Sequence, residues 1–236
     1  MTDLVDAFAT ALRLVVGLDA ALVEIVALSL VVSLTAVVIA TVVGLPLGAV
    51  IAVNRFPGRG TLTVMLSALM GLPPVVVGLV VYLMLSRSGP FGVFGLLFTP
   101  TAMIIAQTLL VLPIIASLAR QVSEELWSEY REQLGSLGVG PARAVTTLLW
   151  DARYGLVTVV LAGFGRASAE VGAVMIVGGN IDHVTRVMTT AIAMETSKGD
   201  LGLALGLGIV LIGISVAVST LTFTLGAATR PVSAAP

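Results

Sequence analysis

The sequence has no cysteine, one histidine and one lysine among its 236 residues. The absence of cysteine excludes disulfide bridges, thiolate metal sites, iron–sulfur clusters and cysteine nucleophiles. With His183 as the single imidazole and Lys198 as the single lysine, most catalytic constellations cannot be assembled, so no catalytic residue is predicted. No metal site is predicted either, because a lone histidine is more typical of a solvated loop than of a set of ligands.

Charged side chains are also scarce in this chain. Only 11% of the residues are charged, whereas 58% are hydrophobic and the mean hydropathy is +1.11, which differs from the usual composition of soluble domains. Twelve basic and 13 acidic residues give a formal net charge of -1, so no footprint for a nucleic acid is expected. The composition indicates an integral membrane protein. Because the chain is too short for a fused nucleotide-binding domain of the usual size, we expect any driving force to come from a partner.

Uncharged runs of about 20 residues or more predict membrane-spanning helices. Four runs contain no charged residue, and a fifth is interrupted only by Arg166 and Glu170. We therefore expect an all-α polytopic membrane protein with about five transmembrane helices. The expected spans are residues 26–53, 62–86, 99–119, 154–178 and 202–227.

Residues 1–19 differ from the rest of the chain, because polar side chains recur there at intervals of three and four between apolar ones. This spacing predicts an N-terminal amphipathic helix. The helix lies in the membrane interface or, alternatively, residues 2–18 form a short sixth span. The acidic start and the lack of a cleavage pattern before Asp19 argue against a signal peptide.

The arginines predict the orientation, because loops retained in the cytoplasm carry an excess of Lys and Arg. Seven basic residues fall on one side of the five expected spans, including those in the short loop at residues 54–59, and four fall on the other. The side with seven is expected to be cytoplasmic. The N-terminus is then outside, and residues 230–236 form a short cytoplasmic tail.

The longest soluble segment, residues 120–153, lies on the expected cytoplasmic side. Charged residues alternate with apolar ones over residues 124–134, which predicts short helices with an exposed charged face. The glycines from Gly135 to Gly140, followed by Pro141, are expected to break the helix. Two interpretations stay open: a compact knob that a partner grips, or an ordinary solvated hairpin.

Residues 131–140 of this segment, Arg-Glu-Gln-Leu-Gly-Ser-Leu-Gly-Val-Gly, resemble the EAA loop in the membrane subunits of ATP-binding-cassette importers. Glu132 and Gly138 match the glutamate and the glycine six residues later, whereas Gln133 and Leu134 replace two small residues. In that family the loop forms a coupling helix that docks in a cleft of the ATPase. The resemblance implies that the coupling residues are Glu132, Gln133, Leu134, Gly135 and Gly138.

Three more segments resemble the molybdate, sulfate and tungstate branch of these permeases. They are Phe-Pro-Gly-Arg at residues 56–59, Gly-Leu-Pro-Pro-Val-Val-Val-Gly at 71–78, and Gly-Phe-Gly-Arg-Ala-Ser-Ala-Glu-Val-Gly-Ala at 163–173. Residues 189–200 are most similar to the tungstate-type subunit. The resemblance covers roughly residues 20–227.

This resemblance implies the type I ABC importer permease fold, MetI-like, over residues 20–229, with the coupling loop at about 120–153. It also implies partners: a second copy of the chain, two ATPase subunits that hold ATP and magnesium, an extracytoplasmic oxyanion-binding protein, and membrane lipid. The chain itself would hold no cofactor. The implied location is the plasma (inner) membrane of a prokaryote, and the implied cargo is a tetrahedral oxyanion, tungstate first, with molybdate or sulfate as alternatives.

Prolines interrupt the first three expected spans at Pro46, Pro73, Pro74 and Pro113, and each removes a backbone donor and crowds the preceding turn. We expect kinks at these positions. In lipid, the freed carbonyl groups need protein or water partners. The resemblance places Pro73 and Pro74 near the translocation path, where they are candidates for a gating element.

Arg166 and Glu170 are predicted to lie four residues apart on one helical face, about halfway along the fifth run, where charge is costly. One interpretation is a structural ion pair, and another is a polar element of the anion path or gate. A rival function, a self-contained secondary transporter or channel, would have this pair as its only candidates for ion coupling. Co-purification with an ATPase separates the two functions.

Overall fold

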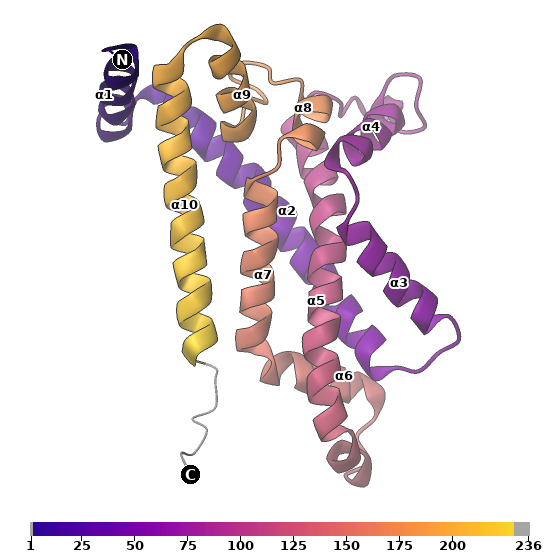
Figure 1. The fold of residues 1–236 in the computed structure, drawn as a ribbon. Helices are drawn as coiled ribbons and strands as arrows, with labels where there is room; N and C mark the ends of the chain where they lie inside the picture. Colours follow the sequence, from indigo (N-terminus) through magenta and orange to yellow (C-terminus); the bar gives the residue numbers. More distant parts are fainter. Residues whose placement is uncertain (1, 229–236) are drawn as a thin grey trace. The chain divides into compact units, whose positions relative to one another are not determined.

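The computed structural model describes residues 2–228 of the chain, which are mainly helical (Figure 1). Within that range there are ten α-helices and one short 3-10 helix, and there is no strand. The predicted all-α fold is therefore confirmed. The expected tail, residues 230–236, lies outside the described residues.

The helices follow one another with short connections. In chain order they are α1 (Thr2–Val16), α2 (Ala20–Val53), α3 (Arg59–Met70), α4 (Pro74–Leu85), the 3-10 helix η1 (Gly92–Phe94), α5 (Pro100–Ser136), α6 (Pro141–Asp151), α7 (Arg153–Ser168), α8 (Gly172–Gly178), α9 (Met188–Lys198) and α10 (Leu201–Ala228).

Three helices, α2, α5 and α10, are long and apolar enough to cross a membrane by themselves. Two pairs, α3 with α4 and α6 with α7, reach that length only when the two helices of a pair are taken as one broken span. Counted in this way, the structure has up to five spans. That total agrees with the five expected from the uncharged runs.

The expected span at residues 62–86 is broken rather than continuous. Helix α3 ends at Met70, and α4 begins at Pro74. Pro73 precedes the new helix in an extended conformation, and Pro74 takes the first helical position, where the missing N–H costs nothing. By contrast, Pro46 and Pro113 lie inside α2 and α5, which continue past them.

The prediction of one continuous helix over residues 154–178 is wrong. Helix α7 ends at Ser168, and after a short non-helical stretch α8 begins at Gly172. Arg166 therefore lies in the last turn of α7, while Glu170 lies beyond it, so the two do not share one helical face. Polar partners from other helices stabilise this break, as described below.

The segment after Arg120 also differs from the expectation of separate short helices. Helix α5 continues without a break to Ser136, so residues 124–134 extend a membrane-spanning helix. Gly135 lies within this helix and does not end it. The break falls at residues 137–140, and α6 starts at Pro141, again in the first helical position.

The contacts divide the chain into two compact units. The first comprises Met1–Ala36, Pro73–Gln107 and Arg166–Ala217, and the second comprises Val37–Leu72, Thr108–Gly165 and Val218–Pro236. The long helices contribute one part to each unit. Each unit is described separately below.

In the first unit, an apolar cluster joins the start of α2 to α9 and α10. Its buried members are Leu22, Ile25, Met188, Ala191 and Leu207. A second contact in this unit joins α4 to α8, which lie close together in Figure 1. A Cβ atom on Gly78 of α4 would lie 2.7 Å from the Cα atom of Ala173, so the two backbones touch.

In the second unit, α6 packs against the last turns of α5 and the end of α2. Val53, Ala144 and Leu148 are buried there, and apolar side chains of α5 cover them. A neighbouring cluster of Ala119, Ala152 and Leu156 continues this packing along the start of α7. Helices α5 and α6 thus form a hairpin with a folded core.

Candidate coupling and translocation sites

The turn between α5 and α6 has the hydrogen bonds of a Schellman motif. The N–H of Val139 donates to the carbonyl of Leu134 over 2.9 Å, and the N–H of Gly138 donates to that of Gly135 over 3.1 Å. Gly138 adopts φ +67°, in the left-handed region where a side chain is strained. Leu134 and Val139 also share the apolar cluster of the hairpin. The turn is therefore well defined by local contacts.

The five expected coupling residues lie together at this turn, but they do not play one role. Glu132 and Gln133 are exposed on the last turns of α5, whereas Leu134 packs into the hairpin. Leu137, which the sequence did not single out, is 76% exposed at the tip. The tip therefore presents a carboxylate, an amide and an apolar side chain to solvent.

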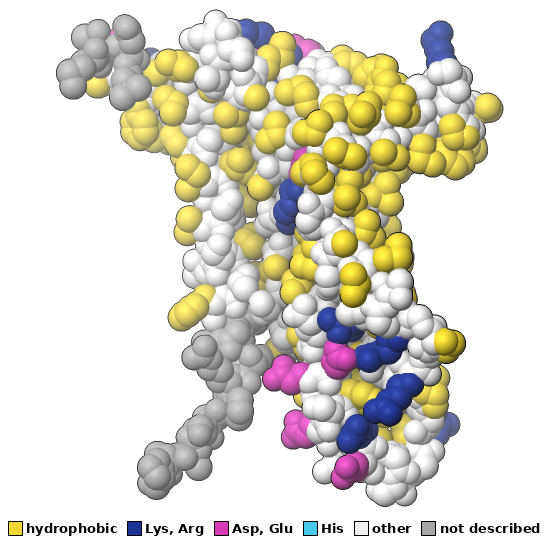
Figure 2. Space-filling view, turned by 45° about the vertical axis from the view of Figure 1, so that its right-hand side comes forward, with side chains coloured by type: hydrophobic (Ala, Val, Ile, Leu, Met, Phe, Trp, Pro, Cys, Tyr) yellow, Lys and Arg dark blue, Asp and Glu magenta, His cyan; other side chains and the backbone are white. Residues whose placement is uncertain are grey.

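Charged side chains gather over this end of the second unit. Figure 2 shows basic and acidic side chains close together in the lower part of the view. This clustering matches the sequence, since α5 carries its charges from Arg120 onward and none before it. The charged end of α5 thus lies outside the apolar part of the helix.

In the first unit, Arg166 and Glu170 form the predicted ion pair. Their Nη1 and Oε2 atoms are 2.6 Å apart. The Glu170 side chain is 3% exposed and that of Arg166 is 33% exposed. The second carboxylate oxygen of Glu170 accepts the N–H of Ala173, in the first turn of α8, over 3.0 Å. Glu170 therefore links the end of α7 to the start of α8.

Two polar side chains from other helices complete the break between α7 and α8. Gln107 of α5 donates its amide N–H to the carbonyl of Ala167 over 3.2 Å. Thr189 of α9 donates its hydroxyl to the carbonyl of Glu170 over 2.7 Å. The carbonyl of Ala167 also accepts the N–H of Glu170 over 3.2 Å. Both backbone oxygens lie at or beyond the end of α7, where the regular donors of the helix stop. The break is therefore held by side chains that are distant in sequence.

A small cavity of about 10 Å³ lies beside this network. Its lining includes Gln107, Ser168 and Glu170. Gln107 Oε1 and Ser168 Oγ are buried and have no hydrogen-bond partner among the described residues. The volume is near the lower limit for one water molecule. In this conformation the cavity is too small for a tetrahedral oxyanion.

Pro73 and Pro74 lie in the same unit as the ion pair, at the start of α4. The carbonyl of Pro73 accepts the N–H groups of Val76 and Val77, which completes the first turn. Val75 lies against α8, because a Cβ on Gly172 would be 2.8 Å from its Cγ2 atom. The proline break thus fixes the start of the helix that packs on α8.

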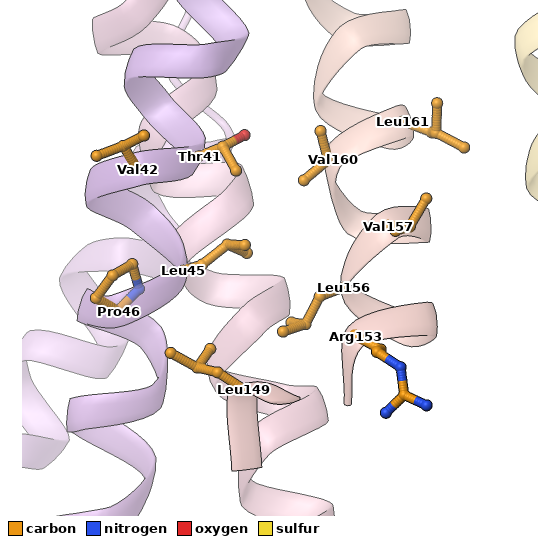
Figure 3. A pocket seen from close by; sticks show the side chains of 10 residues that line it. All are labelled: Thr41, Val42, Leu45, Pro46, Leu149, Arg153, Leu156, Val157, Val160 and Leu161. Atoms are coloured by element: carbon orange, nitrogen blue, oxygen red, sulfur yellow. The ribbon is translucent and has the colours of Figure 1, made fainter. Parts of the chain in front are cut away.

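A larger hollow of about 490 Å³ lies in the second unit between α2 and α7, with Leu149 of α6 at its lower end (Figure 3). Apart from Thr41 and Arg153, its ten lining residues are apolar. In Figure 3 the guanidinium group of Arg153 points away from the hollow. That group lies instead over the rings of Trp150 and Tyr154, 5.2 and 4.7 Å from their centroids. An oxyanion would find no cationic group directed into this hollow.

His183 lies in the connection between α8 and α9 and is 71% exposed, as the sequence predicted for a loop residue. Its Nδ1 atom is nevertheless 2.8 Å from Oε2 of Glu24, at the start of α2. The hydrogen bond to this carboxylate raises the pKa of His183 above its ordinary value of 6.5. His183 therefore tethers its loop to α2.

Sequence reasoning missed Gln107 and Thr189. Gln107 is the single amide side chain in the expected span at residues 99–119, and an isolated polar residue in such a run is a signal of an internal partner. Thr189 carried no comparable signal, because it stands among other threonines outside the expected spans. Its role depends on the carbonyl of Glu170, in the break between α7 and α8.

A comparison with family models matches residues 44–230 to the family described as the inner membrane component of binding-protein-dependent transport systems. The matched stretch includes the Pro73–Pro74 break, the α5–α6 turn and the Arg166–Glu170 pair. It covers most of the chain.

Individual relatives agree with this match. The chain is 44% identical, over 76% of its length and 80% of the relative, to a probable anion ABC transporter permease protein of Haloferax volcanii. It is 43% identical, over 86% of its length and 90% of the relative, to the tungstate uptake system permease protein TupB of Peptoclostridium acidaminophilum. It is 32% identical, over 71% of its length and 63% of the relative, to the sulfate transport system permease protein CysW of a Synechocystis species.

Proposed function

Because the chain belongs to the family of inner membrane components of binding-protein-dependent transport systems, we propose that it is the permease of an ATP-driven tungstate importer. Tungstate is proposed as the cargo because the chain is similar to a tungstate uptake permease over nearly the full length of both chains. The more distant likeness to a sulfate permease makes sulfate and molybdate the competitors to test. The chain is a transport subunit: it moves the cargo across the membrane and catalyses no reaction itself.

The exposed tip of the α5–α6 hairpin supports a docking role. Glu132, Gln133 and Leu137 project from a turn that Gly138 and the hairpin core hold in place. In the proposed complex, two ATPase subunits that bind ATP with magnesium grip the tips of two permease copies. The closing of the ATPases then moves the hairpins, and the spans alternate between outward and inward access.

The break between α7 and α8 is proposed as the part of the path that responds to this motion. A helix interrupted at Glu170 and a proline break at Pro73 and Pro74 meet in one unit through the α4–α8 contact. Since the cavity beside Glu170 is too small for an oxyanion in this conformation, passage of the cargo requires the helices that line it, among them α2, α5 and α9, to move apart.

We propose that the charged end of α5 faces the cytoplasm and that the N-terminus lies outside, as the excess of arginine indicates. Helix α1, at 15 residues, is about 22 Å long at about 1.5 Å per residue. This is shorter than the hydrocarbon core of about 30 Å. The length favours a position in the membrane interface, where an extracytoplasmic binding protein would dock nearby.

Reconstitution in liposomes tests the proposed cargo. Permease, ATPase and binding protein are combined, and the accumulation of tungstate is measured with and without ATP. We expect ATP-dependent uptake of tungstate that excess molybdate reduces and excess sulfate affects less. Equal uptake without the ATPase would instead support a self-contained transporter. Preferential uptake of sulfate or molybdate would show that tungstate is not the cargo, but the protein would still be the permease of an importer.

A charge reversal tests the docking role of the hairpin. Glu132→Arg places the opposite charge on the exposed turn, so we expect uptake to fall by at least tenfold while the permease stays folded. Glu125→Arg makes the same change at an exposed site farther back on α5 and should retain most of the uptake. If the Glu132 variant binds its ATPase and transports normally, the hairpin is not the coupling element.

A further inference from the structure

A pocket of about 160 Å³ in the second unit is lined mainly by polar and charged side chains. It lies between the connection from α2 to α3 and the charged end of α5. Its charged and aromatic lining residues are Arg55, Arg59, Glu124, Trp127 and Arg131. Three guanidinium groups thus share one hollow with a single carboxylate.

That carboxylate is already neutralised. Arg59 Nη2 lies 2.5 Å from Glu124 Oε1, and Arg120 Nη1 contacts the other carboxylate oxygen. Arg59 is held further by its Nε atom, which donates to the carbonyl of Ile51 at the end of α2 over 2.7 Å. This triad carries a net positive charge and is fixed by contacts between α2, α3 and α5.

The other two arginines are unpaired. No carboxylate lies within 4 Å of Arg55 or Arg131 among residues 5–224, whose side chains the structure describes, and both side chains line the pocket from exposed positions. Guanidinium groups pair with planar or tetrahedral oxyanions through parallel N–H bonds. The pocket therefore combines a fixed positive triad with two free cationic arms.

We propose that this pocket binds a tetrahedral oxyanion group. Its volume of about 160 Å³ is far above the roughly 10–15 Å³ that one water molecule needs, which gives room for such a group with some of its water. Trp127 forms an apolar wall, and its partial burial in the hairpin core fixes its position. The pocket is separate from the break at Glu170, which lies in the other unit.

Two sources supply this chemistry. One is the phosphate of an anionic lipid headgroup, which reaches the ends of membrane helices. The other is a free oxyanion in the aqueous phase, including the cargo after its release. In the second case, occupancy of a pocket beside the coupling hairpin would let accumulated cargo slow the transporter.

The experiment uses Trp127 as a reporter. The chain has two tryptophans, and Trp150 is exposed on α6 outside this pocket. In a Trp150→Phe background, the purified permease in a neutral detergent is titrated with sodium tungstate and sodium phosphate, and separately with phosphatidylglycerol in mixed micelles. We expect a saturable change in Trp127 fluorescence with at least one of these probes.

The double variant Arg55→Gln with Arg131→Gln should weaken this binding by about tenfold, because it removes two charge-assisted contacts. Arg143→Gln is the matched control, since Arg143 is exposed on α6 and does not line the pocket. It should leave the affinity within about twofold. Thermal unfolding of each variant checks that the fold is intact.

The outcomes separate the sources. A response to tungstate or phosphate that the double variant loses assigns a free oxyanion, and a response confined to phosphatidylglycerol assigns a lipid headgroup. No saturable response, or an equal loss in Arg143→Gln, overturns the proposal. The titration needs neither ATP nor transport, so its failure is distinguishable from a failure of tungstate uptake.

Discussion

At the end of α5, the backbone of residues 137–139 satisfies the free carbonyl groups locally, whereas at the end of α7 those groups depend on Gln107 and on Glu170 itself. The first break is exposed and short-range. The second is buried and joins side chains from α5 and α9 and a backbone N–H from α8. Both ends interrupt a helix, but only the first leaves its side chains free for a partner.

The two breaks are expected to respond differently to substitution. An exposed side chain such as Glu132 can change without loss of a buried contact, so its variants report on partners. The Glu170 carboxylate accepts hydrogen bonds within the fold, so its variants report first on assembly.

Arg166→Gln is expected to destabilise the protein most, by about 2–3 kcal/mol, because it leaves the buried Glu170 carboxylate without its cation. Glu170→Gln should lower the stability less, by about 1 kcal/mol. The remaining Arg166 is one-third exposed, and the amide oxygen of the new glutamine can still accept the N–H of Ala173. Thermal unfolding in detergent measures both.

The double variant of this pair should be more stable than Arg166→Gln alone, because no unpaired carboxylate remains. The pair does not stabilise the break in this way if Glu170→Gln is less stable than Arg166→Gln, or if the double variant is no more stable than Arg166→Gln. Uptake by the double variant then shows whether the pair also acts in the path.

The ion pair itself was predictable, but the helix end between its members was not. The spacing of Arg166 and Glu170 and the apolar run around them are equally compatible with a continuous span. The break depends on Gln107, 60 residues before Ala167, and on Thr189, 19 residues after Glu170. No local pattern contains these contacts.

Features that depend on neighbouring residues were easier to predict. The proline break was visible because Pro73 and Pro74 act on their own turn, and the number of spans followed from hydropathy. The coupling residues were located by resemblance, yet the length of α5 was underestimated. A charged helix end such as residues 124–134 can extend a span into water when its apolar side packs on α6.

Gly138→Ala is expected to destabilise the hairpin by about 1–2 kcal/mol, because an L-residue is strained at φ +67°. Gly135→Ala is the matched control: Gly135 is helical and has open space around it, so alanine should be neutral or stabilising by about 0.5–1 kcal/mol. Unfolding midpoints compare the two. Equal effects would show that the Schellman turn does not hold the tip.

The smallest expected effect concerns pH and the loop around His183. Since the pKa of His183 is raised above 6.5 by Glu24, its contribution to stability is fully present below that value. It is lost as pH rises through the higher pKa of the folded state. We expect amide hydrogen exchange in residues 180–187, corrected for its intrinsic rate, to become faster over that range. His183→Gln should remove this pH dependence, whereas protection that increases with pH would contradict the tether.

Docking of the α5–α6 tip on an ATPase can be measured directly, because the chain contains no cysteine. A single cysteine replaces the exposed Leu137, or, as the control, the exposed Val93 of η1. Labelling of each variant by a maleimide is followed in detergent, with and without the ATPase. We predict that the ATPase protects Leu137→Cys at least tenfold and leaves Val93→Cys unchanged. Equal labelling of Leu137→Cys in a complex that contains the ATPase would contradict the account.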